Sequence, residues 1–334
     1  MPTKEFMNVR RFLYNEQRLS PKATGEFTTL LLDIILGCKK VCREVRQFGL
    51  SQYQHTTGAI NVQDEEVHEL DDLANDLLLD LLTKGGQTCG VVTEENKEIV
   101  GVPASFERGK YVVTIDPLDG FSNIGVNVNI GTIFSVRKKI SEGEDSNLSD
   151  FLQPGRSQVC AGYVMYGPAM VLVFTIGRGV YEFTYSLGID EFILSRENIR
   201  MPDLLPNKKG SFSANTGYWN LWDDKAKAVS NFFMEGGYSF RHIGSFIADF
   251  HRHLLQGGIF CYPANSKSPN GKLRLLYELA PLSFIAEQAG GLAIDGSRPI
   301  LDLKPDSLHQ RSPVYIGSRD AVIKAMEILA APKR

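Results

Sequence analysis

The stretch YVVTIDPLDGFSN, residues 111–123, runs from an apolar, β-branched segment into two aspartates on either side of Pro117. Aromatic and β-branched side chains favour strands, so residues 111–115 predict a short buried strand. Asp116 follows where that strand ends, and Pro117 restricts φ in the turn that carries Asp119. We therefore expect the two carboxylates to face one point, with Gly120 leaving room for a ligand close to the backbone.

Acidic residues stand at the edge of other apolar segments. Glu94 and Glu95 end the run CGVVTEEN, residues 89–96, and Glu278 lies within LLYELAP, residues 275–281. Asp71 falls at the margin of the apolar stripe of an expected helix, where a carboxylate needs a partner. A helix cap, a solvated turn or a glutamate reaching to the surface accounts for any one of these acids. Their repeated position beside buried segments favours a shared site instead.

Converging carboxylates require a cation, because two unit charges 4 Å apart repel by about 4 kcal/mol at an effective dielectric constant near 20. Oxygen ligands without His or Cys favour Mg²⁺ or Mn²⁺ over zinc. His251 and His253 are two apart on an expected helix and point to different faces, which does not suit a shared metal. Carboxylate-held metals are typical of phosphoryl chemistry, and without a GxxxxGK[ST] motif hydrolysis is favoured over nucleotide-dependent transfer. Lys272 and Arg274 offer nearby positive charge, although a solvated surface explains them equally well.

The whole chain has the composition of an ordinary globular protein. Its 334 residues predict about two domains, with a boundary near residue 200 in SRENIRMPDLLPNKKG, residues 195–210. A net charge of −3 argues against general binding to nucleic acid or anionic membranes. The five cysteines form no CxxC pair, which argues against a disulfide framework and favours a reducing compartment. The longest apolar run, Met170–Phe174, is far too short to span a membrane.

Hydrophobic periodicity predicts helices from Thr28 to near Gly49 and over residues 69–82. Between Asn129 and Ser195, short β-rich segments separated by turns predict an antiparallel meander. The remaining elements are expected in alternation: a strand near Phe212, helices at Asp224–Met234 and Ser245–Leu255, a strand at residues 259–263, then a helix, a strand and a final helix after Ser318.

Longer segments are similar to a known family. The stretch GGIFCYPANSKSPNGKLRLLYELAP, residues 257–281, resembles the class I fructose-1,6-bisphosphatases, and IDPLDG, residues 115–120, resembles the wider lithium-sensitive, metal-dependent sugar phosphatases. ATGEFTTLL (23–31), RGKYVVTIDPLDG (108–120), NIGTIF (129–134), LQPGR (152–156) and HQRSPVYIGS (309–318) extend the resemblance over nearly the whole chain.

The resemblance implies an α/β (α+β) fold with α/β/α/β/α layers and mixed and antiparallel sheets. It implies an N-terminal allosteric, AMP-binding domain over residues 1–200 that carries part of the metal site, and a C-terminal sugar-phosphate-binding domain over residues 201–334. The implied activity is hydrolysis of the 1-phosphate of D-fructose 1,6-bisphosphate, a step of gluconeogenesis, with two or more Mg²⁺ ions per subunit and Mn²⁺ as an alternative. AMP inhibition, a homotetramer and a cytoplasmic location are also implied, or a peroxisome-like organelle if a C-terminal SKL-type tripeptide has been trimmed beyond APKR.

Roles carried over by the resemblance fall into four sets. Metal ligands would be Glu94, Asp116, the carbonyl of Leu118, Asp119 and Glu278. Glu95 and Asp71 would polarise the attacking water. The 1-phosphate would be held by the backbone of Gly120, Phe121 and Ser122, and the 6-phosphate by Asn215, Tyr218, Tyr262, Lys272 and an Arg241 from a neighbouring subunit, with His242 beside it. AMP would bind Thr24, Gly25, Glu26, Phe27, Thr28, Lys110, Tyr111 and Arg137.

Three positions depart from the family pattern: Phe121 stands where Ser is usual, Gly125 where Asp is common, and His242 where Tyr is usual. A backbone grip survives the change at Phe121, because the amide is the donor, whereas the ring alters access to the 1-phosphate. His242 would bind a 6-phosphate more strongly when protonated. Other sugar bisphosphatases, such as one acting on sedoheptulose 1,7-bisphosphate, inositol phosphatases and a metabolite-binding regulator without turnover remain as alternatives.

Overall fold

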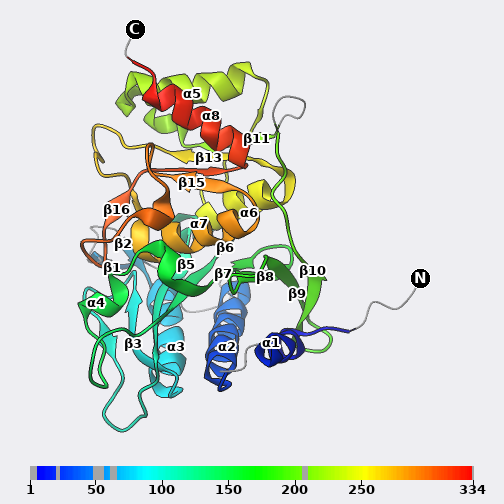
Figure 1. The fold of residues 1–334 in the computed structure, drawn as a ribbon, viewed down its shortest axis with the longest axis vertical. Helices are drawn as coiled ribbons and strands as arrows, with labels where there is room; N and C mark the ends of the chain where they lie inside the picture. The colour runs from blue at the N-terminus through cyan, green and yellow to red at the C-terminus, as the bar shows by residue number, and fades with distance from the viewer. Residues whose placement is uncertain (1–5, 20–22, 48–55, 61–65, 205–209, 333–334) are drawn as a thin grey trace.

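A computed structural model describes residues 6–19, 23–47, 56–60, 66–204 and 210–332. Layers of helix and sheet alternate along the long axis (Figure 1). Helices α1, α2 and α3 cover one face of an eight-stranded sheet, and α6 and α7 separate it from a five-stranded sheet. Helices α5 and α8 cover the far side of the smaller sheet. The predicted α/β/α/β/α layering is confirmed.

The helices are α1 (Val9–Arg18), α2 (Glu26–Gln47), α3 (Glu69–Lys84), α4 (Leu148–Phe151), α5 (Asp224–Glu235), α6 (Phe246–Gln256), α7 (Ala280–Gln288) and α8 (Arg319–Ala330). Short 3₁₀ helices are η2 (Phe121–Val126), η3 (Gly155–Ser157), η4 (Thr216–Leu221) and η6 (Ile300–Asp302), and η5 (Leu275–Leu279) is a π-helix.

The larger sheet has the strand order β10-β9-β8-β7-β6-β5-β3-β4. Its strands are β3 (Thr88–Thr93), β4 (Val100–Gly101), β5 (Tyr111–Asp119), β6 (Ile130–Lys138), β7 (Gln158–Tyr166), β8 (Met170–Thr175), β9 (Tyr181–Ser186) and β10 (Glu191–Arg196). From β5 to β10 neighbouring strands pair antiparallel, whereas β3 and β5 run parallel. The meander predicted over residues 129–195 is therefore confirmed, and β3 and β5 bring Glu94 and Asp116 to the same edge.

The smaller sheet has the order β12-β11-β13-β17-β15. It contains β11 (Ser211–Ala214), β12 (Ser239–Phe240), β13 (Gly258–Tyr262), β15 (Leu292–Ile294) and β17 (Val314–Gly317). Two further pairs lie outside both sheets: β1 (Thr56–Ile60) with β2 (Glu66–His68), and β14 (Leu273–Arg274) with β16 (Arg311–Ser312).

The other helices match the predicted ones to within a few residues, but α1 was not predicted, and the short α4 lies in a stretch expected to be a loop. Only Val9, Phe12 and Leu13 of α1 are buried, and the helix packs on α2 and β10. So short an apolar stripe carries little periodic signal, and tertiary packing supplies most of the stability of a short helix. In α3, Asp72, Asp76 and Asp80 are exposed, as expected of a solvated face.

Apolar side chains fill the spaces between the layers. One cluster lies between α1–α3 and the larger sheet, a second between the two sheets around α6 and α7, and a third between the smaller sheet and α5 and α8. All five cysteines are buried and unpaired, which agrees with the expected lack of a disulfide framework.

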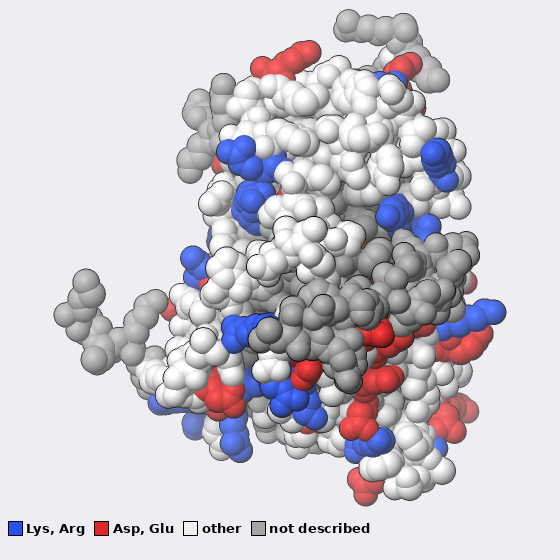
Figure 2. Space-filling model, turned by 180° about the vertical axis from the view of Figure 1, so that it is seen from behind, with Lys and Arg blue, Asp and Glu red and all other residues white. Residues whose placement is uncertain are grey.

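The molecular surface mixes both signs of charge. Figure 2 shows the back of the molecule, where Lys and Arg are scattered over its upper half and lie beside Asp and Glu in its lower half. This mixture accords with the formal net charge of −3. In the described ranges, no helix is long and apolar enough to cross a membrane.

Candidate active site

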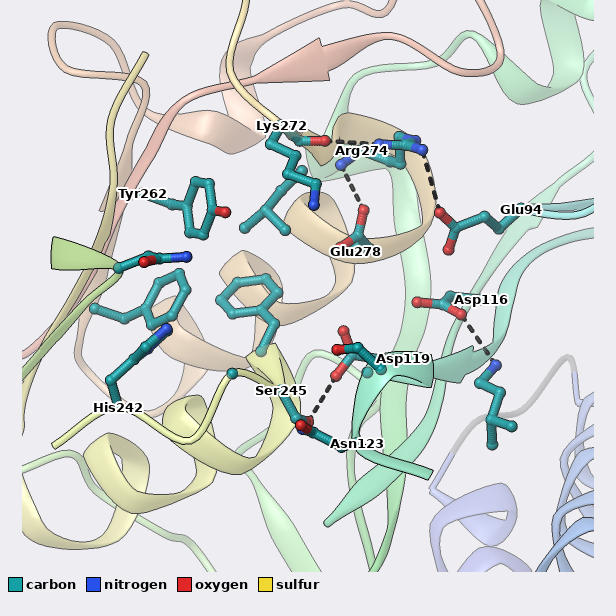
Figure 3. A pocket seen from close by; sticks show the side chains of 18 of the residues that line it. Glu94, Asp116, Asp119, Asn123, His242, Ser245, Tyr262, Lys272, Arg274 and Glu278 are labelled. Atoms are coloured by element: carbon teal, nitrogen blue, oxygen red, sulfur yellow. Dashed lines mark hydrogen bonds and ion pairs between the residues drawn. The ribbon is translucent and has the colours of Figure 1, made fainter. Parts of the chain in front are cut away.

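A cavity of about 280 Å³ lies where the carboxyl ends of β3 and β5 meet segments from the second half of the chain (Figure 3). It brings together fourteen of the residues expected at the metal and substrate sites: Asp71, Glu94, Glu95, Asp116, Leu118, Asp119, Gly120, Ser122, Asn215, Tyr218, His242, Tyr262, Lys272 and Glu278. These residues span more than two hundred positions of sequence, so only the packing of the two sheets unites them.

A β-bulge aims both aspartates of β5 into this cavity. Asp116 pairs with Ile133 of β6 and Asp119 with Gly131, so three steps on β5 match two on β6. Residues three apart on a regular strand point to opposite faces. The extra residue in the bulge reverses that alternation, and both carboxylates come to the same face.

Asp119 is held by the start of helix α6. Its Oδ2 accepts hydrogen bonds from the Ser245 hydroxyl at 2.9 Å and from the Ile247 amide at 3.1 Å. A helix N-terminus favours negative charge, but burial outweighs it and raises the pKa of Asp119 to about 6.

Glu278 enters from the π-helix η5. Its Oε2 accepts the amide hydrogen of Arg274 at 2.5 Å, and the Arg274 guanidinium lies 3.4 Å from Glu94. Figure 3 shows Arg274 between Glu94 and Glu278, above the two aspartates. This explains why an acid can stand within the apolar segment LLYELAP: the segment is a helix buried on its other sides, with Glu278 turned into a polar cavity.

Asp116, Asp119 and Glu278 each offer an oxygen within 4.8 Å of the other two. Burial raises the pKa of Asp116 and of Glu278, and the nearby carboxylate of Glu94 raises both further. At such distances each charged pair repels by about 4 kcal/mol at an effective dielectric constant near 20. Buried carboxylates that repel one another and offer only oxygen ligands fit a hard divalent cation such as Mg²⁺ or Mn²⁺.

Two further acids border the carboxylate cluster. Glu95 follows Glu94 directly after β3, and both are half-buried. Asp71 lies in the first turn of α3 with 5% of its surface exposed. Its burial agrees with its expected place at the margin of the apolar stripe.

The turn after Asp119 offers backbone groups to the same cavity. Gly120 has φ of +89°, a left-handed conformation that other residues rarely adopt, and an added Cβ would lie 3.0 Å from Ser245. Phe121 opens η2, but its side chain lies outside what the structure describes. At Gly125 an added Cβ would meet nothing within 4 Å, so the loss of the family's usual Asp leaves open space and no packing defect.

Neutral and positive groups also line the cavity. Figure 3 shows the Lys272 amino group pointing inward, with Tyr262 and His242 lying away from the carboxylates. Tyr218 and Tyr262 pack edge to face with ring centres 6.4 Å apart. Burial raises the pKa of Tyr262, so its hydroxyl stays protonated and can donate a hydrogen bond.

Arg241 does not line the cavity of its own chain. Its side chain is exposed, and its Nη1 donates to the Phe240 carbonyl at 2.8 Å. The next residue, His242, does line the cavity, and its Nδ1 lies 3.3 Å from the fully buried Asp249. This orientation leaves Arg241 directed outward.

Sequence reasoning missed Ser245 and Asn123, which also line the cavity. Ser245 is the N-cap of α6, where its hydroxyl also accepts from the Ala248 amide at 3.4 Å. The signal for it was present, because Ser before an apolar helix is a typical N-cap. Its contact with Asp119, more than a hundred residues away, is not visible in sequence.

A second cavity, of about 520 Å³, lies between the N-terminal helices and β5 and β6. Six of the eight residues expected to bind AMP line it: Thr24, Gly25, Phe27, Thr28, Lys110 and Tyr111. Glu26 opens α2 beside it and forms an ion pair with Lys110 at 3.0 Å, which lowers the pKa of Glu26.

Arg137 lies elsewhere, contrary to the expectation that it joins the AMP site. Its side chain is 1% exposed and donates to the Ser135 hydroxyl at 2.7 Å and the Thr114 hydroxyl at 3.3 Å. Alternation along β6 turns it away from the N-terminal helices, and Lys138 and Lys139 line the second cavity instead. Burial lowers the pKa of Arg137 to about 10.

Comparison with known proteins gives consistent matches along the chain. Residues 7–197 match the family "Fructose-1-6-bisphosphatase, N-terminal domain", and residues 205–330 match its C-terminal domain. A class 1 fructose-1,6-bisphosphatase of Nitratidesulfovibrio vulgaris is 47% identical over 335 residues, covering 97% of this chain and 98% of the relative. That of Chlorobaculum tepidum is 47% identical over 318 residues, covering 93% and 94%.

A solved structure agrees in fold. Fructose-1,6-bisphosphatase of Leishmania major in its holo form superposes with a TM-score of 0.90 at 34% identity, covering 97% of this chain and 99% of the other. The matches in sequence and structure extend over the cavity, both sheets and the helices that cover them. The chain belongs to the class 1 fructose-1,6-bisphosphatase family.

Proposed function

We propose that the protein hydrolyses the 1-phosphate of D-fructose 1,6-bisphosphate, giving fructose 6-phosphate and phosphate, as a step of gluconeogenesis. The observation that carries this proposal is the buried cluster of Asp116, Asp119 and Glu278 in a cavity into which the amino group of Lys272 also points. A substrate with two phosphates suits a site that offers both a cation-binding cluster and a cationic side chain. Family membership identifies the sugar of the substrate as fructose.

Mg²⁺ is the proposed cofactor, two or more per subunit, with Mn²⁺ as an alternative. Glu94, Asp116, Asp119, Glu278 and the carbonyl of Leu118 would hold it. When bound, such ions neutralise phosphate charge and make a coordinated water more acidic. Arg274 is close to this set: its guanidinium lies 3.4 Å from Glu94, and its backbone amide donates to Glu278.

Protein groups supply orientation and proton transfer. Glu95 and Asp71, which both line the cavity, would accept the proton of the attacking water. The amides of Gly120, Phe121 and Ser122 would hold the 1-phosphate. Asn215, Tyr218, Tyr262, Lys272 and His242 would hold the 6-phosphate, with hydroxyl and ammonium donors directed at its oxygens.

Phosphate release with and without Mg²⁺ tests the proposal. We expect metal-dependent release from fructose 1,6-bisphosphate, much less from fructose 1-phosphate because Lys272 then lacks its anion, and little from inositol 1-phosphate. Faster release from sedoheptulose 1,7-bisphosphate would reassign the substrate. Binding without any release, measured by calorimetry, would favour a sensor over an enzyme.

We also propose that AMP inhibits the enzyme at the second cavity, and that residues 1–200 form the allosteric domain and residues 201–334 the sugar-phosphate-binding domain. The cavity joins an apolar and aromatic wall at Phe27 and Tyr111 to the N-terminus of α2 and the amino group of Lys110. The purine of AMP would pack against the aromatic wall, and its phosphate would bind the helix N-terminus and Lys110.

A homotetramer is the proposed assembly, with Arg241 completing the 6-phosphate site of a neighbouring subunit. The outward direction of Arg241 and the exposed ring of Phe240 beside it support this. Exposed apolar residues at Leu36, Leu187 and Ile189 support contacts between subunits elsewhere.

A further inference from the structure

The bulge in β5, residues 116–119, carries two of the proposed metal ligands and the carbonyl of a third. We call it the metal turn. A bulge interrupts the regular pairing of strands, so its peptide groups need partners outside the ladder. What holds the turn in shape therefore decides where Asp116 and Asp119 point.

Two peptide groups of the turn have a specific side-chain partner. The Leu118 amide donates to Oδ1 of Asp116 at 3.0 Å. The Pro117 carbonyl accepts from the hydroxyl of Thr132 at 2.7 Å, and the Thr132 hydroxyl in turn lies 2.7 Å from the hydroxyl of Tyr166. Thr132 stands on β6 between Ile133 and Gly131, the partners of Asp116 and Asp119, and so lies directly opposite the bulge.

Counting protons fixes the direction of these bonds. A hydroxyl has one proton, and Thr132 uses it on the Pro117 carbonyl, which can only accept. Tyr166 must therefore donate to Thr132. Burial raises the pKa of Tyr166, so its proton is retained across the working range of pH. Tyr166, Thr132 and Pro117 form a one-way chain of hydrogen bonds.

This chain of hydrogen bonds is closed to water. Thr132 is fully buried, and 6% of Tyr166 is exposed. Cys38, on α2, is also buried, and burial raises the pKa of its thiol to about 12, so it stays protonated. Water cannot readily replace a lost hydroxyl in such a place, and the Pro117 carbonyl would be left without a partner.

We propose that Thr132, supported by Tyr166, is a positioning residue for the metal site: its hydroxyl holds the metal turn so that Asp116, Leu118 and Asp119 present their oxygens together. Leu118 illustrates the point, since its side chain packs in the core while the residue lines the cavity, which leaves its backbone facing the site. The inference rests on the proposed metal-dependent function.

Isosteric variants separate the hydrogen bond from packing. Thr132→Val keeps the shape and removes the hydroxyl, Thr132→Ser keeps the hydroxyl, and Tyr166→Phe removes only the support. Thr88→Val is the matched control, because Thr88 is also buried and donates to a backbone carbonyl, that of Leu82, at the end of β3 far from Glu94.

Calorimetric titration of the metal-free protein with Mn²⁺ is the main measurement, and the Mg²⁺ concentration for half-maximal activity is the second. We expect Thr132→Val to weaken Mn²⁺ binding by about tenfold or more, the range for groups that orient metal ligands. Tyr166→Phe should have a smaller effect in the same direction. Thr132→Ser and Thr88→Val should bind Mn²⁺ as the wild type does, even where Thr88→Val lowers the melting temperature.

If the wild type binds Mn²⁺ and Thr132→Val binds it with the same affinity, the inference is wrong and the proposed function still stands. A wild type that neither binds Mn²⁺ nor releases phosphate overturns both. If Thr132→Val does not fold, the Mn²⁺ affinity of Tyr166→Phe becomes the test. An affinity equal to that of the wild type contradicts the proposal.

Discussion

Asp116 is buried among other carboxylates that repel its negative charge. Burial, then Glu94 and Asp119, raise its pKa, so the ionised form is costly until a cation arrives. Asp116→Asn removes one proposed ligand and one repelling charge together. We expect it to lower Mg²⁺-dependent turnover by at least about a hundredfold, since even partners of metal ligands contribute ten- to a hundredfold. Stability should be retained, and full turnover would show that Asp116 is no ligand.

The buried carboxylates of the site predict how the stability of the metal-free protein depends on pH. Asp116, Asp119 and Glu278 have folded-state pKa values above their unfolded ones, so the folded state binds more protons and stability falls as pH rises. For Asp119 the loss begins near the unfolded value of about 3.9 and is complete above its folded value of about 6. Urea unfolding in EDTA between pH 4 and 8 should show this decline, and a shallower one for Asp116→Asn.

At the scale of elements, the first turn of α2 is the proposed anion site for AMP. The N-terminus of α2 and Lys110 lie together there, and Glu26 pairs with Lys110. Lys110→Met should raise the AMP concentration for half-inhibition by about tenfold or more, the worth of one charged hydrogen bond. Lys84→Met, which removes an exposed lysine paired with Asp80, is the control. A wild-type rate unchanged at millimolar AMP would refute the regulatory proposal.

Two elements depart from regular geometry where function is proposed. Both the bulge in β5 and the π-helix η5 carry acids into the cavity. Sequence periodicity assumes regular strands and helices, so it could place Asp116 and Glu278 at the edges of buried segments but could not show which way they point. Such irregularities are over-represented near active sites.

For the whole molecule, a mixing experiment tests whether Arg241 acts across subunits. Arg241→Ala should raise KM for fructose 1,6-bisphosphate by about tenfold or more, as the loss of a charged hydrogen bond predicts. Arg298→Ala, an exposed arginine paired with Asp295, is the control. Sedimentation should first show a tetramer.

The Arg241→Ala and Asp116→Asn proteins are then mixed so that their tetramers exchange subunits. Hybrid tetramers should regain activity at low substrate, because sites with an intact Asp116 receive Arg241 from the neighbouring subunit. If Arg241 serves its own chain, mixing restores nothing.

Resemblance to a known family implied the layered fold class, whereas the residue pattern by itself determined the helices with long apolar stripes, the meander over residues 129–195 and the acids that border buried segments. It did so because periodicity and strand-ending motifs are local properties. Tertiary structure decided the rest: that fourteen distant residues share one cavity, that Arg137 does not line the second cavity, and that Ser245 and Thr132 donate hydrogen bonds to the turn of residues 116–119. These contacts depend on the direction of side chains and on the packing of two sheets, which no local pattern encodes.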